Sequence, residues 1–246
     1  MRYLIVSDIH ANWHALEAVL ADSVGRYAQI VCCGDLVGYG ADPNPVVDWA
    51  RMSVSAIVRG NHDKVCCGLD DPEWFNPVAR TAALWTLATL TEENSRFLQQ
   101  VPRGPRRVDG YSIWHGSPAH EDDYLVSPQE VQEVGGLLRT PLSFFGHTHV
   151  QGGFMLLRHS VRRVPKTPAT AAEQTLEFEP DVRYLLNPGS VGQPRDGDPR
   201  AAYILYDSDE RYLSFHRVRY DVAGAQSRIR AERLPEILAE RLAAGA

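Results

Sequence analysis

The chain has 246 residues, 44% of them hydrophobic, so it is long enough to bury a full core. Its net charge of −6 provides no broad basic face that would follow a nucleic-acid backbone, and we expect no stable nucleic-acid partner. No apolar stretch reaches membrane-spanning length, and the N-terminus runs directly into the apolar residues 3–6 without a basic leader. We therefore expect a cytoplasmic protein without a membrane partner.

Six short apolar runs, each ending in a polar group, organise the sequence. They occupy residues 3–8, 30–35, 55–63, 111–116, 142–149 and 184–190. Runs of this length bounded by Gly or Pro are typical of buried strands, and helical patterns separate the early ones. This alternation predicts βαβ units whose polar groups gather at the carboxyl ends of the strands.

Helical patterns fill the first half of the chain. A helix is predicted over 12–24 with Asn12 as its N-cap, and a second begins near Pro45. A helical insert is expected at about 64–103, in which Pro77 starts one helix and Thr91 begins another. We expect this insert to cover the functional site.

The last third of the chain combines an irregular stretch, two strands and helices. Residues 158–181 lack a clear period and are interpreted as a surface excursion. Strands are predicted at 201–207 and 212–220. A C-terminal helical segment follows at about 222–244, which Pro235 divides into two pieces.

The four cysteines form two adjacent pairs, Cys32–Cys33 and Cys66–Cys67. Neighbouring thiols are poorly placed for an ordinary disulfide, and neither pair has the Cys-x-x-Cys spacing of a structural zinc site. Free thiols in a reducing compartment are the expected state.

An ordered set of aspartates, histidines and one asparagine follows the predicted strands. The motifs are Asp8-x-His10, Gly34-Asp35, Gly60-Asn61-His62-Asp63, His115 and Gly146-His147-Thr148-His149. Side chains two apart on an extended segment point to the same side, so Asp8 and His10 can reach one cation. Oxygen and imidazole donors without thiolate favour Mn²⁺, Fe, Co²⁺, Ni²⁺ or Zn²⁺ over Ca²⁺, and the number of histidines argues against Mg²⁺ alone. Mn²⁺ is our first choice.

The remaining histidines lack such neighbours. His14, His159 and His216 are interpreted as structural or surface residues. His120 follows His115 closely, and a place in a solvated loop is favoured over contact with a substrate.

Several residues are candidate substrate contacts. Arg59, Arg195 and Arg200 could bind phosphate because arginine presents paired donors to phosphate oxygens, with surface ion pairing as the alternative for Arg200. Tyr39 lies between two glycines in a turn that could cradle phosphate or serve only for tight turning. The chain has no Gly-x-Ser-x-Gly or Walker-type loop, so neither a serine hydrolase nor a nucleotide loop is supported.

Taken together, the motifs over residues 8–149 resemble the calcineurin-like metallophosphoesterase superfamily, whose pattern is D-x-H, GD, GNH[DE], H and GHxH. Residues 187–190, Asn-Pro-Gly-Ser, resemble a further family element. The resemblance implies an α/β (α+β) fold, a four-layer αββα sandwich of two mixed β-sheets flanked by helices. It also implies one domain over 1–246, with the metal site at the carboxyl ends of the strands.

The resemblance further implies a centre of two divalent metal ions. One metal would be held by Asp8, His10 and His149, a second by Asn61, His115 and His147, and both by a bridging Asp35. In the implied mechanism a bridging water or hydroxide attacks phosphorus in line. His62 would then donate a proton to the leaving oxygen or stabilise its charge, and Asp63 would orient that imidazole or support the loop.

One departure from the family pattern concerns the subgroup. Protein serine/threonine phosphatases and diadenosine tetraphosphatases carry GDxVDRG, where this chain has Gly38 and Tyr39 in place of Asp and Arg. This loses a phosphate-binding arginine, and the chain is most similar to the small bacterial and archaeal phosphodiesterase-like members.

The expected activity is metal-dependent hydrolysis of a phosphomonoester or phosphodiester, with a small phosphate ester or a nucleotide as the substrate. Three alternatives remain: a dinucleoside polyphosphate hydrolase, a nuclease, or a non-catalytic metal-binding scaffold like the retromer subunit on the same fold.

Overall fold

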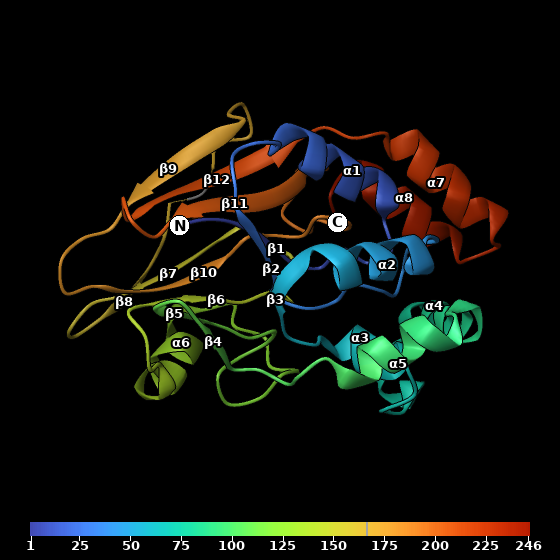
Figure 1. The fold of residues 1–246 in the computed structure, drawn as a ribbon, viewed down its shortest axis with the longest axis horizontal. Coiled ribbons are helices and arrows are strands. Elements are labelled where there is room, and N and C mark those ends of the chain that lie inside the picture. Colours follow the sequence, from blue (N-terminus) through green and yellow to red (C-terminus); the bar gives the residue numbers. More distant parts are fainter. Residues whose placement is uncertain (166) are drawn as a thin grey trace.

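The structure is a computed structural model that describes residues 1–165 and 167–246. Lys166, within the stretch predicted to be irregular, lies outside the described residues. Two six-stranded sheets lie face to face (Figure 1). Sheet A has the order β3 (Val54–Ile57), β2 (Gln29–Cys32), β1 (Arg2–Val6), β11 (Ala201–Asp207), β12 (Tyr212–Val218), β9 (Glu173–Glu177). Sheet B has the order β4 (Arg106–Val108), β5 (Tyr111–Ile113), β6 (Leu142–Phe144), β10 (Arg183–Asn187), β7 (Gly152–Leu156), β8 (Val161–Arg163).

Each sheet contains three neighbouring parallel strands beside antiparallel ones. These are β1, β2 and β3 in sheet A, and β5, β6 and β10 in sheet B. They correspond to the six apolar runs of the sequence, so this prediction is confirmed. The parallel strands bring six carboxyl ends together, three from each sheet.

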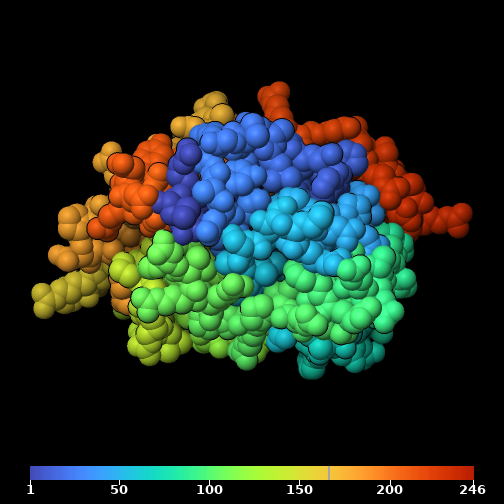
Figure 2. Space-filling model, in the orientation of Figure 1, coloured from blue at the N-terminus to red at the C-terminus, as the bar shows by residue number. Residues whose placement is uncertain are grey.

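Helices complete the outer layers of the sandwich. On sheet A lie α1 (Trp13–Asp22) and α2 (Pro43–Ser53). Helix α7 (Val222–Ala231) packs against α1, and α8 (Glu236–Ala244) packs against α7. Helix α6 (Pro128–Val134), followed by the short helix η2 (Gly135–Leu137), packs on the outer face of sheet B (Figure 1). Figure 2 shows α1 and α2, in blue, forming a continuous surface with the green helices of the insert.

Three apolar cores separate these four layers. Strand β1 shows why: Leu4 and Val6 point into the core under the helices, while Tyr3 and Ile5 point into the core between the sheets. The alternation follows from the two-residue period of a strand. A third core, which includes Val131 of α6, lies behind sheet B. The αββα sandwich implied by the resemblance is therefore confirmed.

The insert consists of helices, as its capping residues indicated. It contains α3 (Asn61–Cys66), η1 (Pro72–Trp74), α4 (Pro77–Thr89) and α5 (Glu92–Gln100). Thr91 caps α5 by accepting a hydrogen bond from the backbone N–H of Asn94. In the same way Asn12 caps α1, although that helix ends two residues before the predicted Val24.

Residues 158–181 are not irregular throughout, because they include β8 and β9. Strand β9 is polar and alternates between exposed and half-buried residues, so it has no apolar run that could mark it in the sequence. Its pairing with β12, in which Thr175 lies opposite Ser214, completes the edge of sheet A. Strand β7 and helix α6 also lie outside the elements predicted. Among the described residues, no helix has the length and apolar character needed to cross a membrane.

Candidate metal centre

The predicted metal ligands follow five of the six parallel strands, at their carboxyl ends between the two sheets. In sheet A, Asp8 follows β1, Asp35 follows β2 and Asn61 begins α3 after β3. In sheet B, His115 follows β5 and His147 follows β6. Residues far apart in sequence therefore meet at one edge, as the βαβ pattern predicted.

Two overlapping groups of side chains have the geometry to hold metal ions. Ligand atoms within 4.8 Å of one another are offered by a first group of Asp8, His10, Asp35 and His149, and by a second of Asp35, His115 and His147. The Asn61 Oδ1 atom lies 3.2 Å from His115 Nε2 and so joins the second group. Asp35 belongs to both groups, which is the position expected of a bridging carboxylate.

The ring nitrogens of three histidines are oriented by backbone carbonyls. The Nδ1 atom of His10 lies 3.0 Å from a backbone carbonyl oxygen of another residue. The corresponding distance is 2.8 Å for His115 and 2.6 Å for His149. A carbonyl only accepts, so each Nδ1 carries the proton. Burial holds the pKa values of His10 and His149 well below the usual value, so these two rings are neutral and each has a bare lone pair on Nε2. The Nε2 atoms of His10 and His149 face each other at 3.0 Å. Two lone pairs at this distance repel unless a cation lies between them, so the donor set fits a metal ion.

The buried carboxylates of the cluster also favour a bound cation. Asp8 and Asp35 are at most 1% exposed, and burying carboxylates is costly unless positive charge accompanies them. Burial raises the pKa of Asp8 to about 7. Burial also acts to raise the pKa of Asp35, but His115 and its neighbours outweigh it and hold that pKa well below its usual value. Burial would lower the pKa of His115, but Asp35 raises it to about 10. Without a metal, His115 carries the compensating charge.

The backbone of this region is unusual as well. Seven of its non-glycine residues have a positive φ between 48° and 67°: Asp8, His10, Ala11, Asp35, Tyr39, His147 and His149. Such conformations are uncommon for non-glycine residues and persist only where the surrounding structure enforces them. Their concentration at one edge of the sheets marks this edge as the functional site.

The Asn-Pro-Gly-Ser element after β10 fastens the ligand loops. The Asn187 side-chain amide donates to the carbonyl of Gly146 at 2.8 Å and to the Thr148 hydroxyl at 3.0 Å. The Ser190 hydroxyl donates to the carbonyl of Asp8 at 2.7 Å. The element thereby holds the segment of His147 and His149 from sheet B beside the Asp8 turn of sheet A.

His62 lies in a tight space beside the cluster. Its ring centroid is 4.3 Å from that of Tyr39 and 4.5 Å from that of Phe75, and its buried Nδ1 has no hydrogen-bond partner within the described chain. Burial lowers the pKa of His62 to about 4. A Cβ atom on Gly38 would lie 2.4 Å from His62 Nδ1, and Gly38 has a φ of +86°. The glycine that distinguishes this chain from the protein phosphatases therefore makes room for the imidazole.

Asp63 is buried and binds backbone amides. Its carboxylate accepts hydrogen bonds of 2.8–3.2 Å from the N–H groups of Asp35, Leu36, Val37 and Gly60. These contacts fit the second of its two predicted roles, support of the loop, and none of them reaches the imidazole of His62.

The three candidate arginines differ in their partners. Arg59 makes two hydrogen bonds of 2.9 Å to Glu121, and Arg200 pairs with Asp198. In the part of the chain that the structure describes, no carboxylate pairs with Arg195, whose guanidinium lies 5.5 Å from the ring centroid of Tyr39. Of the three, only Arg195 is available to an anion at the site.

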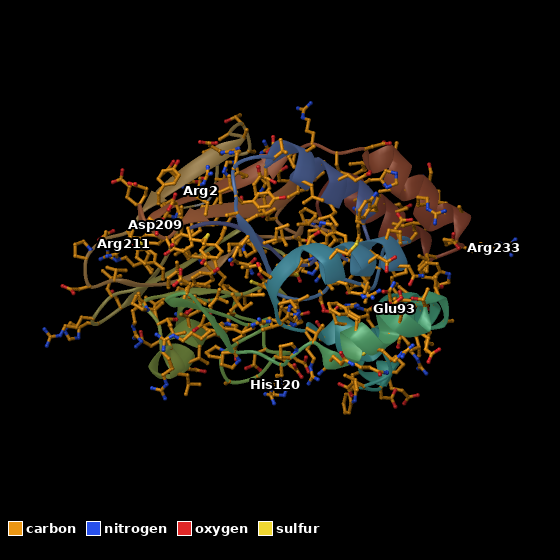
Figure 3. All side chains as sticks on the ribbon, viewed as in Figure 1. Arg2, Glu93, His120, Asp209, Arg211 and Arg233 are labelled. Atoms are coloured by element: carbon orange, nitrogen blue, oxygen red, sulfur yellow. The ribbon has the colours of Figure 1, made fainter. Side chains whose placement is uncertain are left out.

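The sequence did not indicate two aromatic residues that contact the site. Phe75 packs on His62, and Tyr124 lies with its ring centroid 3.9 Å from that of His147. Both lie in loops without a motif, and only their short distance along the chain from His62 and His115 could have drawn attention to them. His120 is exposed and points away from the molecule in Figure 3, as the solvated-loop interpretation predicted.

Comparisons with known proteins identify relatives of the chain. Residues 1–211 match the model of the calcineurin-like phosphoesterase superfamily domain. The chain is 36% identical to the uncharacterized protein MJ0912 of Methanocaldococcus jannaschii, over 98% of this chain and 97% of that protein.

Solved structures extend the similarity. A metallophosphoesterase from Sphaerobacter thermophilus is 40% identical, with a TM-score of 0.86 over 100% of this chain and 99% of its own. The hypothetical protein PH1004 from Pyrococcus horikoshii shares the fold at 18% identity, with a TM-score of 0.75 over 100% and 98% of the two chains. These relatives are small bacterial and archaeal proteins, as predicted. The chain belongs to the calcineurin-like phosphoesterase superfamily.

Proposed function

We propose that the protein is a metal-dependent phosphoesterase that hydrolyses a small phosphomonoester or phosphodiester at a dinuclear centre. The observation that carries the proposal is the position of Asp35, which is shared by two groups of buried ligand atoms. Two cations, one in each group, would give every ligand atom a metal partner, with Asp35 shared between them.

The proposed ligands divide as the sequence implied. Asp8, His10 and His149 would hold one ion, and Asn61, His115 and His147 the other, with Asp35 shared. When bound, the two cations would supply charge stabilisation for the phosphoryl oxygens and a water molecule of lowered pKa as the nucleophile. The donor set favours a transition metal, and Mn²⁺ remains our first choice.

The protein's own residues would bind the phosphate and assist the leaving group. Arg195 is the proposed phosphate contact, because it is half-buried beside Tyr39 and forms no ion pair within the described residues. His62 is proposed to act on the leaving oxygen, and Asp63 to position the 35–37 turn through its hydrogen bonds. Arg59, predicted as a substrate contact, has Glu121 as its partner instead.

We also propose that residues 1–246 form one metallophosphoesterase domain, because α7 and α8 share an apolar core with α4 of the insert and with Tyr39. A cytoplasmic location is proposed as well. It is supported by the four cysteines, all of which are free and buried.

The test compares metal-free and Mn²⁺-restored protein on aryl phosphates, phosphodiesters, nucleotides and dinucleoside polyphosphates, with metal content measured on the same preparation. We expect about two bound ions per chain and turnover of at least one ester. Two tightly bound ions without turnover on any ester would instead favour the scaffold alternative. A DNA-cleavage assay tests the nuclease alternative.

A further inference from the structure

Tyr124 covers part of the metal centre without belonging to it. Its ring lies against His147, with centroids 3.9 Å apart and planes inclined by 36°. The residue is nevertheless 53% exposed. A tyrosine that packs one face on a proposed ligand and leaves much of its surface to solvent lies at the entrance of the site.

The loop that carries Tyr124, residues 117–126, is fastened to α3 by ion pairs. Arg59, directly before the Gly-Asn-His-Asp motif, binds both carboxylate oxygens of Glu121 at 2.9 Å. Lys64 of α3 binds Asp122 at 2.5 Å. Both basic residues are at most a quarter exposed, so these pairs are better shielded from water than ordinary surface pairs. The position of Tyr124 is therefore fixed relative to the helix that carries His62.

The loop is also compact within itself. The Ser117 hydroxyl donates to Asp123 at 2.7 Å and accepts from the backbone N–H groups of Ala119 and His120 at 3.0 Å. Tyr124 follows directly after this turn. A rigid loop reduces the entropy that an aromatic side chain loses when it binds a ligand.

Arg195 lies near the same entrance. Its guanidinium lies 5.5 Å from the ring centroid of Tyr39, and its backbone N–H donates to the carbonyl of His149 at 3.2 Å. Tyr124 packs on His147, two residues before His149, so Arg195 and Tyr124 flank the same segment. A phosphate group held by Arg195 would have the exposed ring of Tyr124 beside it.

From this arrangement we propose that Tyr124 is a specificity-determining residue, which stacks on a planar aromatic group of the substrate such as a nucleobase while Arg195 binds the phosphate. The inference rests on the proposed function for the place of the phosphate. Stacking on an aromatic side chain tolerates any base, because every base has a π-face. The substrate class would be nucleotide esters rather than sugar or alkyl phosphates.

The experiment measures binding without turnover. A phosphonate analogue of adenosine 5′-monophosphate, in which carbon replaces the ester oxygen, and the same analogue without the base are titrated into the Mn²⁺-loaded protein by calorimetry. The quantity of interest is the ratio of the Kd of the baseless ligand to the Kd of the complete ligand. We expect this ratio to be about ten in the wild type. Tyr124→Ala should reduce this ratio to within about twofold, with the baseless ligand unchanged, and Tyr124→Phe should preserve it.

Tyr212→Ala is the matched control, because it removes a tyrosine that is 41% exposed in β12, outside the site. Its ratio should equal that of the wild type. Glu121→Gln, which weakens the tie to Arg59, should lower the ratio without affecting the baseless ligand. Melting temperatures of all variants identify any loss of folding, and Tyr124→Trp, which keeps a ring at the position, should retain the ratio.

A wild-type ratio near one would overturn the proposal, and so would a tenfold ratio that survives in Tyr124→Ala. Failure of both ligands to bind would also overturn it. The proposed hydrolysis is tested separately. A protein with the tenfold ratio but no turnover on any ester would support the stacking site and contradict the proposed enzymatic activity.

Discussion

Two buried polar clusters of this molecule differ in how completely their hydrogen bonds are made. In the cluster on β11 and β12, which we call the His216 cluster, His216 Nε2 lies 2.7 Å from the Ser214 hydroxyl and its ring stacks on Tyr203. The Tyr203 hydroxyl donates to Asp22 at 2.5 Å. Each of these polar groups has a complementary partner, as expected of a cluster that only stabilises the fold.

The metal-site cluster lacks this complementarity. The bare nitrogens of His10 and His149 face each other, and the buried His62 Nδ1 and His147 Nε2 have no partner in the described part of the chain. The surrounding backbone has positive φ values, whereas the His216 cluster lies on two regular strands and the end of helix α1. The gathering of unmatched nitrogens around the proposed metal ligands, rather than any single unmatched group, therefore indicates where a cation belongs.

The substitution expected to separate the two clusters most is Asp35→Asn. It removes a negative charge that both ligand groups share. Substituting residues that only hydrogen-bond to metal ligands typically lowers metal affinity or activity by about 10–100-fold. For a direct ligand we therefore expect turnover to fall at least about a hundredfold. Bound metal should fall as well, as measured by elemental analysis. Asp22→Asn, in the His216 cluster, is the control and should leave metal content unchanged. Full metal content and turnover in Asp35→Asn would refute the shared-ligand assignment.

Gly38→Ala tests whether the crowded position of His62 matters. The added Cβ would approach His62 Nδ1 to 2.4 Å and displace the ring, so we expect kcat to fall about a hundredfold, the lower range for a proton-transferring group. Metal content should stay the same.

Gly110→Ala is the matched control for this substitution. Gly110 has a φ of +83°, close to the +86° of Gly38, but a Cβ there would meet nothing within 4 Å. Both variants share the cost of an alanine at positive φ, and only Gly38→Ala should lose activity. Equal kcat values in the two variants would show that the position of His62 is unimportant.

Metal binding should stabilise the protein because it satisfies the unmatched cluster. At a free Mn²⁺ concentration a hundred times the Kd, the stabilisation is about 2.7 kcal/mol. For a chain of this size this corresponds to a rise in Tm of about 5–10 °C, measurable by differential scanning fluorimetry. Asp35→Asn should lose the rise and Asp22→Asn should keep it. An equal rise in both would place the stabilising ion elsewhere.

The smallest effect is expected in the His216 cluster, through pH. Burial lowers the pKa of His216 to about 4 in the folded state. The unfolded chain, with a histidine pKa of about 6.5, therefore binds more protons between these values, and folding stability falls as pH drops from about 6.5 toward 4. The histidine should account for about 2 kcal/mol of the stability lost between pH 7.5 and 5.

Urea unfolding of the wild type and His216→Gln at the two pH values measures this contribution. Because glutamine does not titrate, the variant should lose about 2 kcal/mol less than the wild type. Equal losses in the two proteins would mean that His216 is protonated in the folded state. Turnover at pH 7.5 should be unchanged, which keeps this cluster apart from the metal site.

The sequence alone determined the six strands and the residues that follow them. Apolar runs ending in Asp8, Asp35 and the Gly-Asn-His-Asp segment are local signals, and parallel strands necessarily bring their carboxyl ends to one edge. Helix starts at Asn12 and Thr91 were equally readable, because capping depends on neighbours three residues away. These features need no knowledge of distant contacts.

Only the tertiary structure decided which candidate side chains are free for a substrate. Arg59 and Arg195 look alike in the sequence, yet Arg59 pairs with Glu121, 62 residues away, whereas Arg195 has no ion-pair partner in the part of the chain described. Tyr124 reaches His147 through a loop whose course is set by such pairs. A polar edge strand such as β9 is recognisable only from the strand beside it. The physical reason is the same each time: charge pairing, stacking and edge pairing depend on partners that the fold, rather than the neighbouring sequence, provides.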